Sequence, residues 1–168
     1  MKFTCSTCGE EHDLANVTFG TEAPDQWSKL TEDERQASEL GGEQCVIKTN
    51  SEEGYFVRAL LEIPVQSRNQ VFTWGVWCSL SKKSFLEVAD HWHDDNRVNT
   101  GPNFGWLCTS IPGYAPTMFL KCQVHQQAVG IRPLVELEAT DHELSLHQRN
   151  GITIGELQQI IAGILHAA

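Results

Sequence analysis

The alternation of side chains between two faces, in two neighbouring segments, constrains the fold of this chain more than any other feature of its sequence. In residues 71–80, VFTWGVWCSL, one face carries Phe72, Trp74, Val76, Cys78 and Leu80. In residues 45–65 a turn at 50–54 separates two expected strands, and one face of the second carries Tyr55, Val57, Ala59, Leu61 and Ile63. A period of two residues is typical of strands with a buried face. The pattern therefore predicts a β-sheet with a large apolar core face.

Helical periodicity is present in two other segments. In residues 81–92 apolar residues recur at helical spacing behind a serine that is available as the N-cap. Near the C-terminus the i, i+3, i+4 stripe consists of Leu157, Ile160, Ile161, Ile164 and Leu165. Thr153 and Glu156 form a capping box ahead of this stripe, so a C-terminal amphipathic helix is expected. Residues 141–151, DHELSLHQRNG, have no clear period and are interpreted as a polar loop.

Further short strands are expected within residues 104–109, 117–125 and 132–140. Strands in succession with helices between them favour an α+β fold, in which an antiparallel or mixed sheet is covered by helices. No repeat or linker divides the chain, so we expect a single domain over residues 1–168. Residues 1–16, which contain a Cys-x-x-Cys motif, are expected to pack on this domain as a zinc-knuckle-like segment.

The charge of the chain excludes some classes of partner. Twelve Lys and Arg residues against 22 Asp and Glu residues give a net charge of -10. This sign repels the phosphate backbone of nucleic acids and anionic lipid headgroups, and no basic stripe interrupts it. We therefore expect no nucleic-acid partner and no membrane partner, and a protein partner, if there is one, to be basic. The oligomeric state does not follow from the sequence.

The cysteines are interpreted together with the expected location of the protein. No apolar run is long enough for a secretory signal or a membrane span, which predicts a cytoplasmic protein. Six cysteines in a reducing compartment are expected to be thiols or metal ligands rather than a disulfide framework. Catalysis by Cys78 or Cys108 with His125 as a base stays open, although the apolar strand neighbours of both cysteines favour buried structural thiols.

The N-terminal segment FTCSTCGEEH contains the residues with the most specific chemistry. Two thiolates three residues apart, Cys5 and Cys8, can converge on one metal ion, and a glycine directly after the second helps the turn. A structural zinc ion takes four ligands, and we expect His12 and Cys45 to supply the others, with His125 and His142 as further candidates. Two alternatives remain, a redox-active dithiol and a pair of loop cysteines without a role.

The polar segment 140–149 is a second candidate site. Within it, an acid, two imidazoles, an amide and a guanidinium lie close together in sequence: Asp141, His142, His147, Gln148 and Arg149. Loops are where binding groups concentrate, so this set is a candidate for orienting a ligand. The same residues also suit a plain polar connection ahead of a capped helix.

Six segments in order resemble a bacterial family catalogued as domain of unknown function 2199: FTCSTCGEEH, QCVI, FVRALLEIPV, FTWGVWCSLS, FGWLCTSIPGY and VHQQAVGIRPLVELEATDHELSLHQRNGIT. The resemblance covers nearly the whole chain. It implies a single-domain, cytoplasmic bacterial protein without an assigned activity. The polar positions that recur in the family match Cys5, Cys8, His12, Cys45, Arg58, His125, Arg132, Asp141, His142, Gln148 and Arg149.

Three functional hypotheses follow. The first is a zinc-binding structural or interaction module, in which the N-terminal knuckle attaches the start of the chain to the sheet. The second is a metal-dependent enzyme with a cleft lined by His125, Arg132, Asp141, His142, Gln148 and Arg149. The third is an acidic immunity-type protein that blocks a basic partner through electrostatic attraction.

Overall fold

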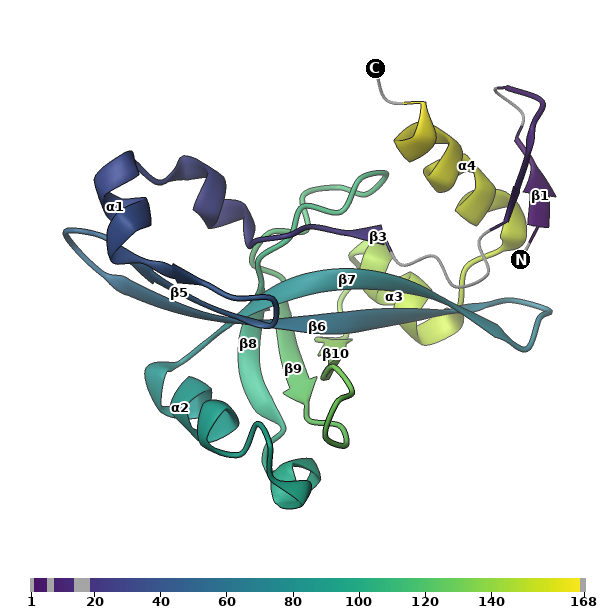
Figure 1. The fold of residues 1–168 in the computed structure, drawn as a ribbon. Helices are drawn as coiled ribbons and strands as arrows, with labels where there is room; N and C mark the ends of the chain where they lie inside the picture. The colour runs from purple at the N-terminus through teal and green to yellow at the C-terminus, as the bar shows by residue number, and fades with distance from the viewer. Residues whose placement is uncertain (1, 6–7, 14–18, 167–168) are drawn as a thin grey trace.

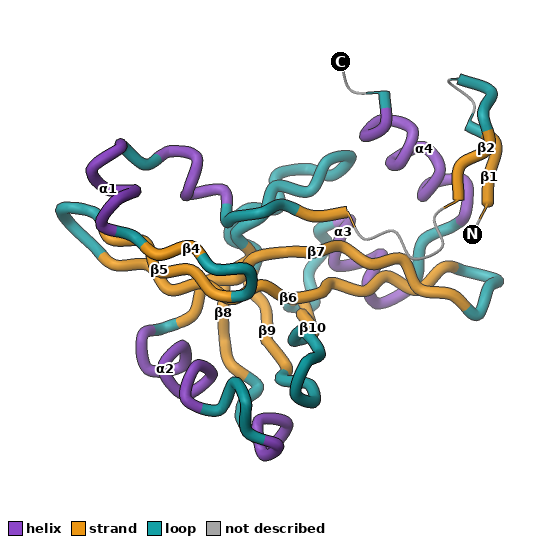
Figure 2. Tube along the Cα trace, viewed as in Figure 1, coloured by secondary structure: helices purple, strands orange, loops and turns teal. Residues whose placement is uncertain are grey.

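The computed structural model describes residues 2–5, 8–13 and 19–166. Its elements in chain order are β1 (Lys2–Thr4), β2 (Glu11–Asp13), β3 (Phe19–Gly20), the 3₁₀ helix η1 (Asp25–Lys29), α1 (Glu32–Ala37), β4 (Glu39–Leu40), β5 (Gln44–Lys48), β6 (Glu53–Val65), β7 (Gln70–Leu80), α2 (Lys82–Asp90), the 3₁₀ helix η2 (Asp95–Asn99), β8 (Asn103–Leu107), β9 (Lys121–His125), β10 (Leu134–Leu137), α3 (Glu143–Asn150) and α4 (Ile154–Leu165). Strands β3 to β10 form one sheet, while β1 and β2 form a separate hairpin beside α4 (Figures 1 and 2).

Strands β6 to β10 form a closed five-stranded barrel. Each strand pairs antiparallel with the next along the chain. Five such strands leave the first and the last pointing the same way, so the barrel closes through a parallel pairing of Leu134 in β10 with Leu60 in β6. The expected fold, a sheet covered by helices, is therefore wrong. Residue alternation specifies which face of a strand is buried but not how far the sheet curves, and here it curves until its ends meet.

Three short strands extend the sheet beyond the barrel. Strand β5 pairs antiparallel with the first half of β6, and β4 pairs antiparallel with β5. Strand β3 runs parallel to β7, with Phe19 opposite Trp74. This approach requires a glycine at position 20, because a Cβ on Gly20 would lie 2.7 Å from the carbonyl oxygen of Gly75. The long hairpin of β6 and β7 is therefore shared by the barrel and its extension.

The barrel interior is the main apolar core. The residues that alternation places on the inner faces of β6 and β7 are buried, apart from the half-buried Tyr55: Val57, Ala59, Leu61, Ile63, Phe72, Trp74, Val76, Cys78 and Leu80. A second, smaller cluster consists of Cys45, Ile47, Phe56, Trp77 and Cys108. The indole nitrogen of Trp77 donates to the carbonyl oxygen of Thr21 at 3.2 Å. The middle of β7 is therefore buried on both of its faces, as expected for a strand between two apolar clusters.

Two of the helices agree with their sequence patterns. Helix α2 begins after Ser81, whose hydroxyl accepts from the amide of Ser84, and it buries Phe85 and Val88 against the core. Helix α4 has the expected capping box and buries Leu157, Ile161 and Ala162. Both helices use an apolar stripe to cover the core, the usual arrangement for a surface helix.

The segment interpreted as a polar loop is in fact helix α3. The Nδ1 atom of His142 accepts from the amide of Leu144 at 3.2 Å and so caps the helix, which is too short and too polar to show a period. Helix α3 packs against both β6 and β10, beside the single residue pair, Leu134 with Leu60, through which these strands are joined, and we call this part of the wall the barrel gap. The Gln148 amide group donates to the Val135 carbonyl oxygen at 2.6 Å and accepts from the Leu137 amide at 2.8 Å. One side chain thus replaces a neighbouring strand along this part of β10.

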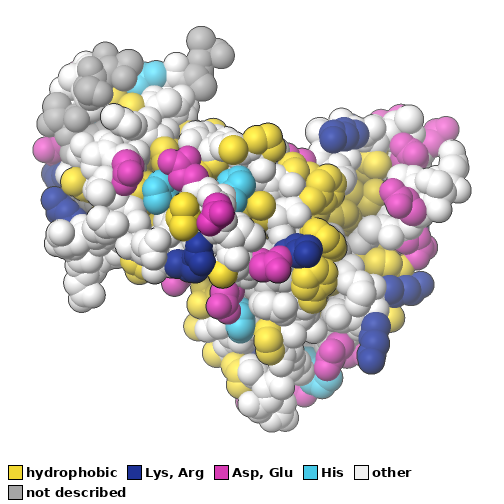
Figure 3. Space-filling model, turned by 180° about the vertical axis from the view of Figure 1, so that it is seen from behind, with side chains coloured by type: hydrophobic (Ala, Val, Ile, Leu, Met, Phe, Trp, Pro, Cys, Tyr) yellow, Lys and Arg dark blue, Asp and Glu magenta, His cyan; other side chains and the backbone are white. Residues whose placement is uncertain are grey.

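The charged side chains of both signs are mixed on the face that Figure 3 shows. On the face opposite to that of Figure 1, acidic and basic side chains are interspersed among apolar ones (Figure 3). Some of them pair between elements, as Lys121 does with Glu138 at 3.7 Å and Arg132 with Glu43 at 2.7 Å. The net charge of -10 is thus an excess of acid within a mixed surface.

Candidate metal centre

Cys5 and Cys8 lie between the two strands of the β1–β2 hairpin. The two strands pair antiparallel over their three-residue lengths. Within the turn the Cys5 amide donates to the Glu10 carbonyl oxygen at 2.8 Å, and the Gly9 amide donates to the Cys5 carbonyl oxygen at 2.9 Å. Gly9 has a φ of 76°, a left-handed conformation that favours glycine. The hairpin thereby gathers Cys5, Cys8 and His12, as the spacing predicted.

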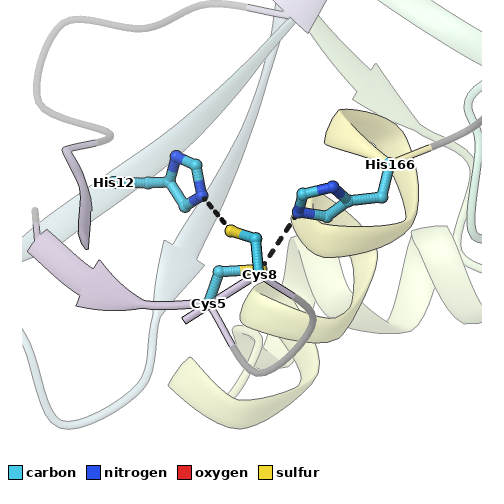
Figure 4. Close-up of side chains that lie close together, drawn as sticks. All are labelled: Cys5, Cys8, His12 and His166. Atoms are coloured by element: carbon cyan, nitrogen blue, oxygen red, sulfur yellow. Dashed lines mark hydrogen bonds between the residues drawn. The ribbon is translucent and has the colours of Figure 1, made fainter. Parts of the chain in front are cut away.

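Helix α4 adds a histidine that the sequence analysis did not name. His166 directly follows the helix, and its amide donates to the Ala162 carbonyl oxygen at 3.1 Å. The buried side chains of Leu157 and Ile161 hold α4 on the main core, and Cys5 belongs to the same apolar cluster. Because the hairpin turn and the helix pack on one core, residues 5 and 166 lie side by side (Figure 4).

The four side chains converge on a small volume. The Sγ atom of Cys5 lies 3.3 Å from Nε2 of His166, and Sγ of Cys8 lies 3.3 Å from Nε2 of His12. One ligand atom from each residue lies within 4.8 Å of the other three. A tetrahedral zinc ion, at about 2.3 Å from sulfur and about 2.05 Å from nitrogen, has sulfur–nitrogen edges of about 3.6 Å. The two observed edges are within a few tenths of an ångström of this length, so the group can hold a metal ion.

Cys45, the expected fourth ligand, lies outside this group. It is in β5, where it pairs with Phe56 of β6 and belongs to the second apolar cluster around Trp77. Burial raises the pKa of its thiol to about 12, which keeps the sulfur neutral. The expected strand is present as β5, which begins one residue earlier at Gln44, but it flanks β6 and not the N-terminal hairpin. Cys45 is therefore a core residue, and His166 is the fourth member of the Cys/His group.

The expected cleft residues separate into two groups. His125, Gln148 and Arg149 line a cavity of about 1000 Å³ that follows β9, β10 and α3 on the outside of the barrel. Nε2 of His125 lies 2.9 Å from Oε2 of Glu136 in the same lining. Gln148 is already engaged by the backbone of β10. None of the four Cys and His residues of the candidate metal centre is among the described residues that line this cavity.

The other three cleft candidates lie elsewhere. Arg132 makes a two-armed ion pair with Glu43, with its Nε atom at 2.8 Å and its terminal nitrogen at 2.7 Å. Asp141 is exposed in the bend before α3. His142 caps that helix. Arg132 and His142 thus stabilise loop and helix structure, and Asp141 lies in the bend before α3.

The thiols considered as nucleophiles are buried in the core. Cys78 and Cys108 are fully buried, whereas His125 is on the outer face of β9. A hydrogen bond with Cys122, followed by burial, raises the pKa of Cys78, and burial raises the pKa of Cys108. Neutral, enclosed thiols are poor nucleophiles, which agrees with the structural interpretation.

No local signal in the sequence identifies His166. It is 161 positions from Cys5 and has no partner cysteine or histidine at a ligand spacing of its own. The one available indication is its position directly after the expected C-terminal helix. That helix has an apolar stripe and therefore packs on the core, where the N-terminal segment was also expected to pack. Only the tertiary fold places His166 next to Cys5.

The comparisons with known proteins add one match. A family model described as "Uncharacterized protein conserved in bacteria (DUF2199)" matches residues 4–152. The matched range contains Cys5, Cys8 and His12 and ends before α4, so His166 lies outside it. No curated protein and no solved structure matches the chain. Within residues 2–5, 8–13 and 19–166, no helix combines the length and the apolar character that crossing a bilayer requires.

Proposed function

The chain belongs to the DUF2199 family of uncharacterised bacterial proteins, and on that premise we propose that it is a zinc-binding structural module in which one ion joins the β1–β2 hairpin to helix α4. The observation that carries the proposal is the convergence of two sulfur and two imidazole nitrogen atoms within 4.8 Å of one another. These atoms come from two elements at opposite ends of the described sequence. The family description names no activity, so the site itself is the guide to function.

The chemistry of the donors favours zinc. Thiolate and imidazole ligands together suit Zn²⁺, which has no preference for a non-tetrahedral geometry. Structural zinc sites have four protein ligands, whereas catalytic sites keep one position for water or substrate. Cys5, Cys8, His12 and His166 supply four donors, which supports a structural site.

The hairpin is the part of the fold that has most need of such an ion. Strands β1 and β2 have three residues each, and an isolated two-stranded hairpin is marginal in water. Its ion pair between Lys2 and Glu11, at 3.0 Å, is exposed and contributes little. The binding free energy of a structural ion becomes folding free energy of the segment that it holds. Zinc would thereby fix the hairpin against α4.

The two alternative functions have less support. An enzyme would need an open metal position or a cleft beside the metal, and the cavity with His125 and Arg149 has a lining that, among the described residues, excludes the four donors. A protein that blocks a basic partner retains the net charge of -10 as its support.

Metal content and coordination test the proposal. We expect protein purified under reducing conditions to hold about one zinc ion per chain by mass spectrometry. X-ray absorption at the zinc edge should give two sulfur neighbours at about 2.3 Å and two nitrogen neighbours at about 2.0–2.1 Å. The Cys8→Ser variant should lose the ion, whereas the matched variant Cys45→Ser should keep it. A wild-type chain that takes up no zinc, or the reverse behaviour of the two variants, contradicts the proposal.

A further inference from the structure

The six cysteines differ in exposure. Cys8 is exposed, in the turn of the β1–β2 hairpin. The other five are at most 2% exposed: Cys5, Cys45, Cys78, Cys108 and Cys122. An oxidant in solution therefore meets one cysteine of this chain first, and that cysteine belongs to the candidate metal centre.

Burial protects the core cysteines chemically as well as sterically. The thiolate is the form that reacts with oxidants, and a buried thiol holds its proton. Burial raises the pKa of Cys45 to about 12 and also raises the pKa of Cys108. By contrast, the sulfur of a zinc-bound cysteine is already deprotonated. Reactivity is thus expected at the metal centre and not in the core.

Cys5 is placed to complete a reaction that begins at Cys8. Their Sγ atoms lie within 4.8 Å of each other, and the two side chains lie close together in Figure 4. A disulfide needs a sulfur–sulfur distance of about 2.05 Å, so the two atoms have to close by at most about 2.8 Å. Cys5 is screened from solvent, with 1% exposure, yet it is within reach of Cys8. One accessible and one screened sulfur make an attacking and a resolving pair.

We propose that Cys5 and Cys8 form an oxidative modification site, at which hydrogen peroxide converts the two thiolates to a disulfide and the bound metal is released. This inference rests on the metal-binding function proposed above. The Cys8 thiolate attacks one peroxide oxygen, the O–O bond breaks and hydroxide leaves, which yields a sulfenic acid. The Cys5 thiolate then attacks the Cys8 sulfur, forms the S–S bond and expels a second hydroxide. The sulfurs lose two electrons, the peroxide gains them, and two protons from solvent convert both hydroxides to water.

Oxidation removes half of the metal ligands at once. A disulfide sulfur carries no thiolate charge, so the ion retains only the imidazoles of His12 and His166. Two neutral ligands hold zinc far more weakly than four donors of which two are anionic. The hairpin then loses its link to α4 while the barrel and its buried cysteines stay intact. Reduction of the disulfide restores the ligand set.

The test treats the zinc-loaded full-length chain with hydrogen peroxide in the presence of a chromogenic chelator. The sample is alkylated under denaturing conditions at intervals, and its peptides are mapped by mass spectrometry. We expect a Cys5–Cys8 disulfide, lighter by two hydrogen atoms, to accumulate in step with zinc release. Oxidation of the four core cysteines should be at least about tenfold slower, as expected for enclosed thiols. Dithiothreitol followed by zinc should return the starting state.

The outcomes separate this inference from the metal proposal. A chain that carries zinc but keeps its zinc and both thiols under peroxide overturns the inference alone. So does the prior formation of a disulfide between Cys78 and Cys122, whose Sγ atoms lie 3.8 Å apart in the core. A chain without zinc before peroxide is added overturns both proposals, and the metal content measured at the start identifies that case.

Discussion

Replacing His166 with alanine is the sharpest single test of the metal centre. His166 is exposed and follows the last residue of α4, so the change creates no enclosed cavity, and the side-chain contacts that it removes are those with Cys5 and His12 of the candidate centre itself. Without metal we expect the stability of the variant to stay within about 0.5 kcal/mol of wild type, as for ordinary surface substitutions. With metal we expect a large difference, because one of four donors is lost.

The size of that difference follows from the ligand count. Structural zinc sites bind with about 10–16 kcal/mol in total, which averages about 2.5–4 kcal/mol per ligand, or about 10²- to 10³-fold in Kd. With free zinc at 100 times the wild-type Kd, binding stabilises the wild-type fold by about 2.7 kcal/mol. A variant with a hundredfold higher Kd gains about 0.4 kcal/mol. The difference of about 2.3 kcal/mol corresponds to about 5–9 °C in Tm for a chain of this size.

Two measurements check this expectation. Competition with a chromogenic chelator gives the zinc Kd, and thermal denaturation with and without zinc gives the shift in Tm. The matched control is His93→Ala, which removes another exposed histidine in the turn after α2, away from α4 (Figure 1). It should retain the wild-type Kd and the full zinc-dependent shift. Equal zinc affinity of His166→Ala and wild type would refute the four-ligand assignment.

Further predictions concern the core, the barrel gap and the surface. Trp74→Ala should cost about 3–5 kcal/mol in urea denaturation, and an unchanged midpoint would contradict the burial of Trp74. Trp77→Phe should cost about 1 kcal/mol more in stability than Trp74→Phe. The Trp77 indole donates to Thr21, whereas the Trp74 indole nitrogen has no hydrogen-bond partner among the described residues. Equal costs would argue against the hydrogen bond of Trp77. Gln148→Ala should cost about 2–3 kcal/mol and speed amide exchange at Leu137, and unchanged protection there would show that Gln148 does not cap β10. Duplex DNA should not bind detectably at about 0.15 M salt, and micromolar binding in a salt titration would contradict the inference from charge.

The buried faces of the long strands could be predicted from the sequence, because alternation is a local property of a strand. In β6 and β7 the inner faces expected from the sequence are the buried ones, because a period of two residues follows directly from the pleat. Trp77 is buried although it lies on the opposite face of β7, since a second cluster covers that side. The residues of this cluster come from β5, β6, β7 and the chain after β8, which no local pattern connects.

The closure of the barrel was not predictable in the same way. It depends on the pairing of Leu60 with Leu134, which are far apart in sequence. The sequences of the two strands do not indicate that they pair with each other. The helix at 143–150 was missed because it depends on a histidine cap and on contacts with the barrel gap rather than on an apolar stripe. Tertiary contacts decide both features.

The candidate metal centre also combines residues that are close in sequence with one that is distant. The spacing of Cys5, Cys8 and His12 was sufficient to place three residues together, because a short turn between strands determines their positions. The fourth residue depended on which element packs beside that turn. Cys45 was a reasonable candidate as the first residue of an expected strand, but β5 lies on the flank of β6, and α4 is the neighbour of the hairpin.

The contact between Cys5 and His166 also has a consequence for the unfolded chain. The two residues are 161 positions apart, so an ion that holds both turns almost the whole polypeptide into a ring. Confining a loop of that length removes unfolded-state entropy worth about 5 kcal/mol in the simple cross-link relation, as long as the ion stays bound. A disulfide between Cys5 and Cys8 closes a loop of only a few residues, worth about 2 kcal/mol by the same relation. The same two sulfurs therefore close either a ring that spans the 161 positions from Cys5 to His166 or a ring of only a few residues, and the choice between them changes how much of the unfolded chain is restrained.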